Sequence, residues 1–123
     1  MKVKDFEDLQ ASIVDWADMH ELLKSENARK QFLKFIEEIF EFKTEMDLLN
    51  LFGADEFTFE NIELEMGDIF VTLIILCEQL NISPQKCLSM AYEKIKDRKG
   101  KTINGVFIKE GDLKWQIYKN KDK

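Results

Sequence analysis

The sequence predicts an all-α fold: a four-helix bundle followed by a short C-terminal extended arm or hairpin. The chain has 123 residues, a length that suits one domain. One proline and five glycines are too few for the many turns of an all-β fold. Apolar residues make up 45% of the chain and charged residues 34%, so a packed core is expected rather than disorder.

The first two helices are predicted from apolar spacing and one capping residue. The first runs from about Asp5 to Leu23, with its apolar side chains mostly on one side. Ser25 is a candidate N-cap for the second helix, which continues to about Leu51. One apolar stripe of this helix contains Phe35, Ile39, Phe42, Met46 and Leu49. A polar flank contains Gln31, Lys34, Glu38, Glu41 and Glu45.

The last two helices also have local start signals. Thr58 is a candidate cap for the third helix, which runs to about Leu80. Ser83 followed by Pro84 predicts the start of the fourth, because proline suits the first helical position. The fourth helix is expected to end near Lys99–Gly100, and the Asn104–Gly105 pair predicts a turn in the arm. We expect a single domain over residues 1–123, with a helical core at about 12–100 and a basic arm at about 101–123.

The third helix is apolar on nearly every side. A helix of this kind is normally buried, and in a chain this small its complete burial implies a subunit interface. We therefore expect a homo-oligomer. A polar stripe formed by Glu65, Asp68 and Thr72 interrupts the apolar surface in the N-terminal half.

The charge is unevenly distributed. The formal net charge is −6, which argues against a general nucleic-acid binder. Residues 1–93 carry 8 basic and 20 acidic side chains, whereas residues 94–123 carry 10 basic and 4 acidic ones. The basic end is either a solvated tail or a segment that holds an anion near an acidic metal site.

Several features predict a cytoplasmic protein without a membrane segment. Cys77 and Cys87 lack neighbouring histidines, so we expect reduced thiols and not a zinc site. The first ten residues contain no apolar stretch typical of a signal peptide. The longest apolar run, Ile69 to Leu76, is too short to span a bilayer.

Two acidic pairs are the candidate chemistry. Glu38 and Glu41, and likewise Glu65 and Asp68, are three residues apart and so share one helix face. Taken alone, a pair like the first is more often part of a solvated face. The second lies in an apolar helix beside Gly67, a poor helix former that would also permit close approach of a neighbouring helix. Two unpaired carboxylates there are costly to bury unless a cation binds them.

Carboxylate oxygens from two facing helices favour a hard cation. Mg²⁺ is the expected ion, and Mn²⁺ is a possible substitute. Mg²⁺ sites of this kind usually include water and substrate phosphates. The pattern therefore indicates phosphate chemistry.

Three segments together resemble a known family. QFLKFIEEIFEF, ELEMGDIFVTL and SPQKCLSMAYEKIKDRKGK resemble the MazG-like all-α nucleoside triphosphate pyrophosphohydrolases. Their pattern E-E-x-x-E, a spacer and E-x-x-D is matched by residues 37–41, 23 intervening residues and residues 65–68. The tail RKGKTINGVFIKE is similar to the phage and prophage branch. The resemblance covers roughly residues 12–112.

The resemblance implies Mg²⁺-dependent hydrolysis of a (d)NTP to the monophosphate and pyrophosphate, as in house-cleaning of the nucleotide pool. It implies four metal ligands: Glu38, Glu41, Glu65 and Asp68. Glu37 would lie next to these ligands without binding the metal itself, or it would act as a base that orients water. Three basic residues would contact phosphate: Lys34, Lys94 and Arg98. The resemblance also implies a dimer or a dimer of dimers.

Other functions remain open from the sequence. A non-catalytic helical oligomer that binds a nucleotide or a partner would keep the same fold. A purely structural oligomer without a ligand is a third hypothesis. Phosphoribosyl-ATP pyrophosphatase is a further enzyme alternative within the same superfamily, and the phage-type tail argues against it.

Overall fold

The computed structural model describes residues 1–112 and 117, without the side chains of residues 56–58. The described part is mostly helical, which confirms the all-α class. The helices are α1 (Phe6–Met19), the 3₁₀ helix η1 (Ser25–Asn27), α2 (Ala28–Phe52), α3 (Glu56–Gln79) and α4 (Pro84–Ile95). The strands are β1 (Gly100–Ile103) and β2 (Val106–Lys109). Two compact units, Met1–Pro84 and Gln85–Lys123, divide the chain.

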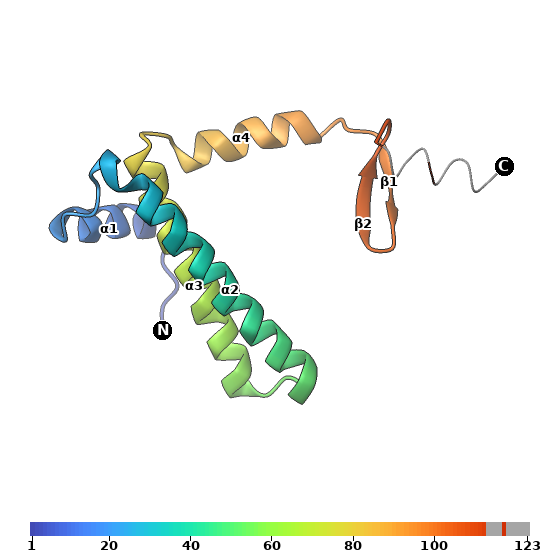
Figure 1. The fold of residues 1–123 in the computed structure, drawn as a ribbon, viewed down its shortest axis with the longest axis horizontal. Coiled ribbons are helices and arrows are strands. Elements are labelled where there is room, and N and C mark those ends of the chain that lie inside the picture. Colours follow the sequence, from blue (N-terminus) through green and yellow to red (C-terminus); the bar gives the residue numbers. More distant parts are fainter. Residues whose placement is uncertain (113–116, 118–123) are drawn as a thin grey trace. The chain divides into compact units, whose positions relative to one another are not determined.

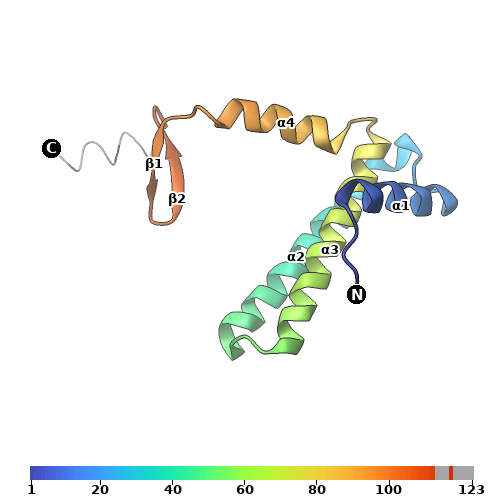
Figure 2. The ribbon, with the colours of Figure 1, turned by 180° about the vertical axis from the view of Figure 1, so that it is seen from behind.

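The first unit is organised around a hairpin of two long helices. α2 and α3 lie side by side in both views (Figures 1 and 2) and make the most extensive contact between elements. Gly53, with a φ of 77°, follows α2 and allows the chain to turn. One set of less exposed positions on each helix recurs at alternating spacings of three and four, as in a coiled-coil seam. They are Gln31, Phe35, Glu38, Phe42, Glu45 and Leu49 on α2, and Ile62, Glu65, Ile69, Thr72, Leu76 and Gln79 on α3.

Helix α1 packs on α3, mainly over its C-terminal half. Ala17 is fully buried, and the rings of Phe6 and Phe70 meet edge to face at a centroid distance of 6.1 Å. α1 ends at Met19, earlier than predicted, because Glu21 takes a φ of 59°. The amide of Leu22 then donates to the carbonyl oxygen of Ala17 at 2.9 Å, which closes the helix end.

The predicted capping residues of the next two helices do not coincide with the observed starts. Ser25 begins η1 and α2 begins at Ala28, so the prediction that Ser25 caps this helix is wrong. The 3₁₀ turn has replaced the cap, and Asn27 makes no side-chain cap bond either. α3 begins at Glu56, two residues before Thr58, whose side chain lies outside the described residues.

Burial of α3 within the single chain is confined largely to its C-terminal half. Ile74 and Ile75 are buried, whereas Leu64 is 64% exposed and Met66 36% exposed. A Cβ added to Gly67 would meet no described atom within 4 Å. The expected close approach of a helix at this glycine is therefore not found within the described part of the chain.

The second unit contains α4 and a small hairpin. α4 begins at Pro84, as predicted, and ends at Ile95, before the predicted Lys99–Gly100. β1 and β2 pair antiparallel around Asn104 and Gly105, whose φ angles of 51° and 79° suit a two-residue turn. The predicted Asn-Gly turn is confirmed, and of the two forms predicted for the arm, extended or hairpin, residues 100–109 form the hairpin.

No single helix among the described residues is long and apolar enough to cross a bilayer. Only the consecutive pair Phe59–Gln79 and Pro84–Ile95, taken together across a break, reaches the required length and composition.

Candidate metal centre

The candidate site lies where acidic residues occupy the seam between α2 and α3. Glu38 is only 7% exposed, although it is a charged residue. Glu65 holds an equivalent position on α3 and is half-buried. Neighbouring seam positions on α2 are Phe35 and Phe42. The helix pairing therefore carries two carboxylates into a partly apolar contact, where charge is costly without compensation.

Three of the four predicted metal ligands form one cluster. Glu38, Glu65 and Asp68 each offer a carboxylate oxygen, and these oxygens lie within 4.8 Å of one another. Asp68 follows Glu65 by three residues on α3, so both point from one helix face, and its side chain is exposed. The cluster thus has a buried end at Glu38 and a solvent-facing end at Asp68.

Glu41, the fourth predicted ligand, interacts with the same cluster. Its pKa is raised, first by a hydrogen bond shared with Glu38 and then by the charge of Glu38. Desolvation raises the pKa of Glu65, and the charges of Asp68, Glu38 and Glu45 raise it further. A hydrogen bond from Glu41 partly offsets this increase. Negative charge is therefore crowded at this point of the hairpin.

Two buried oxygens in the cluster fit a cation. The Oε2 atoms of Glu38 and Glu65 are buried and accept no hydrogen bond from any described residue. Buried polar atoms normally have partners, and a divalent cation coordinates oxygens of this type. Opposite oxygens around Mg²⁺ lie about 4.2 Å apart, from a bond length of about 2.1 Å. Three oxygens on one Mg²⁺ include adjacent pairs about 3.0 Å apart, from the same bond length, so the three side chains would move inward from separations of up to 4.8 Å.

Lys34 contacts the carboxylates directly. Its Nζ lies 3.3 Å from Glu38 Oε1 and 3.5 Å from Glu37 Oε1. The pKa of Lys34 is raised, chiefly by its hydrogen bond with Glu38. Glu37 itself is exposed. Lys34, a predicted phosphate contact, therefore lies against Glu38, a predicted metal ligand, and against the neighbouring Glu37.

The remaining predicted phosphate contacts belong to the second unit. Lys94 lies in the last turn of α4, and the amide of Arg98 donates to the carbonyl oxygen of Ile95 just beyond it. Both side chains are exposed. Within this unit they form part of a basic stretch that continues into the hairpin at Lys99 and Lys101.

Glu45 belongs to the polar flank predicted for the second helix and is not one of the predicted site residues. The structure assigns it a seam position seven residues after Glu38, where it is half-buried and raises the pKa of Glu65. The alternating spacing of Phe35, Glu38, Phe42 and Glu45 is the sequence signal that would have identified it.

The chain was also compared with known proteins. No family model, curated protein or solved structure matches it. The MazG-like resemblance therefore remains a prediction based on the acidic motifs and their spacing.

Proposed function

We propose that this protein is a Mg²⁺-dependent nucleoside triphosphate pyrophosphohydrolase, which cleaves a (d)NTP between the α- and β-phosphates. The observation that carries the proposal is the seam cluster of Glu38, Glu65 and Asp68, with two buried carboxylate oxygens lacking hydrogen bonds. Hydrophobic packing does not require charges at these positions. A cation that also binds phosphate does require carboxylates at these positions.

In this proposal the chain's own groups have separate tasks. Glu38, Glu41, Glu65 and Asp68 hold Mg²⁺, for which Mn²⁺ can substitute. Bound Mg²⁺ would neutralise the polyphosphate and increase the acidity of a water molecule. Glu37 is exposed beside the cluster and acts as the carboxylate that accepts a proton from water. By the resemblance, Lys94 and Arg98 remain predicted phosphate contacts, and their exposed side chains are accessible to an anion.

The function is tested by a pyrophosphate-release screen over common and modified nucleoside triphosphates, with and without Mg²⁺. The proposal expects release from at least one triphosphate that depends on Mg²⁺. Absence of release from every triphosphate, with a folded protein by circular dichroism, would overturn it.

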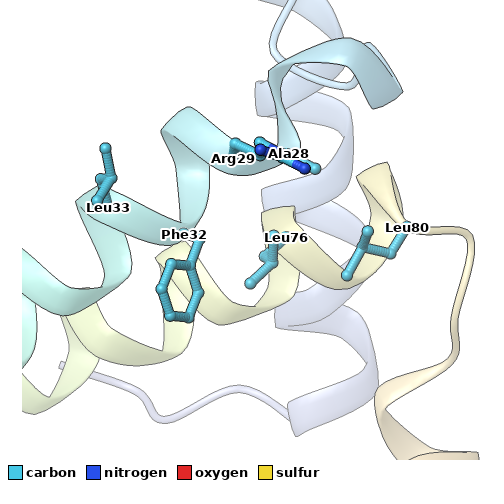
Figure 3. Close-up of a pocket in the computed structure, with 6 residues that line it drawn as sticks. All are labelled: Ala28, Arg29, Phe32, Leu33, Leu76 and Leu80. Carbon is cyan, nitrogen blue, oxygen red and sulfur yellow. The ribbon is translucent and has the colours of Figure 1, made fainter.

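We also propose that the protein acts as a homo-oligomer, a dimer or a dimer of dimers, in which a second copy completes the MazG-like four-helix arrangement. Support comes from apolar side chains exposed on the first unit. Phe32, Leu33 and Leu80 line a pocket of about 410 Å³ between α2 and α3, and each is at least half exposed (Figure 3). On α4, Leu88 and Tyr92 are also exposed. Light scattering on the purified chain tests this, and a monomer at micromolar concentration would oppose it.

A second candidate function is a non-catalytic binding module. The apolar pocket lined by Phe32, Leu33, Leu76 and Leu80 favours it, because the pocket is separate from the acidic cluster and contains no carboxylate. Nucleotide binding without hydrolysis, or thermal stability that responds to a partner but not to Mg²⁺, would favour this alternative.

A further inference from the structure

Lys34 and Glu38 form an ion pair in which one side chain is exposed and the other is buried. The Lys34 side chain is 50% exposed, whereas that of Glu38 is 9% exposed. They are four residues apart on α2, with lysine on the N-terminal side, which is the weaker orientation for such helical pairs. Helical spacing brings the two groups within reach, although this orientation adds little stability. The crowded carboxylates around Glu38 add attraction for any cation nearby.

Lys43 and Asp47 provide an internal comparison. This pair has the same spacing and orientation on the same helix, with an Nζ–Oδ2 distance of 2.8 Å. Both of its side chains are more than half exposed. It has the geometry of an ordinary surface ion pair, which contributes little to stability. The Lys34 pair differs from it because its carboxylate belongs to the acidic cluster.

We propose that Lys34 is an exchangeable counter-ion of Glu38: a divalent cation displaces its ammonium group, which then becomes available to a substrate phosphate. The inference rests on the proposed function, because it assumes a cation at the cluster. It explains why a residue expected at phosphate instead lies on a metal ligand.

Charge and flexibility both favour displacement over joint occupancy. If both cations stayed on Glu38, two positive groups would share one carboxylate and repel each other. The ammonium group is held by a flexible stem and is half exposed, so water can solvate it after release. Its other partner, Glu37, is exposed and holds it only weakly.

The first experiment measures Mn²⁺ binding at pH 8 by electron paramagnetic resonance, without nucleotide. Lys34→Met is expected to bind Mn²⁺ about three- to tenfold more tightly than the original chain, because a competing cation is removed. Lys43→Met serves as the matched control and is expected to leave the affinity unchanged. Equal or weaker binding by Lys34→Met would overturn the inference.

The second experiment requires no substitution. Lysines of the original chain are acetylated with an activated ester, and the rate at each site is measured by mass spectrometry. Saturating Mg²⁺ is expected to increase the rate at Lys34 and leave that at Lys43 unchanged. An unchanged or slower rate at Lys34 would show that the ion pair persists and overturn displacement.

The two proposals fail in distinguishable ways. If the original chain binds no Mn²⁺ at millimolar concentration, both the metal site and the counter-ion exchange are wrong. If it binds Mn²⁺ but either Lys34 experiment gives the contrary result, the exchange alone is wrong and the proposed function stands.

Discussion

Glu38 of α2 and Glu65 of α3 each have a carboxylate oxygen that is buried and accepts no hydrogen bond from the described residues. The two side chains contribute to one cluster with Asp68, in which the ligand oxygens lie within 4.8 Å of one another. Buried carboxylates at such separation repel each other and are poorly solvated. The arrangement is costly to the metal-free fold, and a bound cation would reverse that cost.

Removal of one ligand should abolish activity without unfolding the chain. Asp68→Asn keeps the shape of the side chain and removes its charge, so we expect Mg²⁺-dependent pyrophosphate release to fall by at least about 100-fold. The helical signal in circular dichroism should not change, because Asp68 is exposed. Asp47→Asn, on the exposed surface of α2, is the control. Comparable losses in both variants would contradict the assignment of the site.

Glu45 should strengthen cation binding without being essential. Its charge adds to the negative potential at Glu65, so Glu45→Gln is expected to weaken Mn²⁺ binding about two- to fivefold. Glu63→Gln is a suitable control because Glu63 is exposed on α3 and has no position in the seam. Titration calorimetry distinguishes the two, and equal affinities in all three proteins would exclude a role for Glu45.

Stability should depend on pH through Glu65. Its pKa is raised in the folded protein, chiefly by desolvation and then by the charge of Asp68, so the folded chain binds a proton more readily than the unfolded chain. This group therefore makes the metal-free protein less stable as pH rises from the ordinary glutamate pKa, about 4.3, through the raised value.

The pH effect is measured as a difference between two proteins. Thermal unfolding of the original chain is compared with that of Glu65→Gln across this acidic window, without metal. The variant should become more stable relative to the original chain as pH rises, and saturating Mg²⁺ should reduce or reverse the difference. A difference that is independent of pH would contradict the raised pKa.

Gly67 should weaken α3 within the isolated chain. The space around its Cα is open, and glycine in a helix interior costs about 1 kcal/mol relative to alanine. Gly67→Ala is thus expected to increase the free energy of unfolding by about that amount, as measured by urea denaturation. Destabilisation would instead indicate that another surface, such as a second copy, packs against this glycine.

Most elements of the fold could be predicted from the sequence, but which side of α2 packs against α3 could not. Local signals sufficed for the Ser83–Pro84 helix start and for the Asn104–Gly105 turn. The apolar stripe predicted along α2 includes Ile39 and Met46, yet these side chains are 37% and 46% exposed. Packing against α3 determines which side chains of α2 are buried, and Glu38 is one of the residues at that contact.

The site was likewise only partly predictable. Spacing within each helix showed that Glu65 and Asp68 share a face, because that geometry is local. Which carboxylates meet across the hairpin depends on the register of α2 against α3, which local spacing does not define. For the same reason the role of Glu45 and the contact between Lys34 and Glu38 became visible only in the structure.

The most direct test of the central claim is ³¹P nuclear magnetic resonance of the products formed from a triphosphate that passes the screen. With Mg²⁺, the original chain is predicted to yield a nucleoside monophosphate and pyrophosphate, while Glu65→Gln yields neither above the uncatalysed rate. Orthophosphate and a diphosphate as primary products, or full activity in Glu65→Gln, would contradict the account.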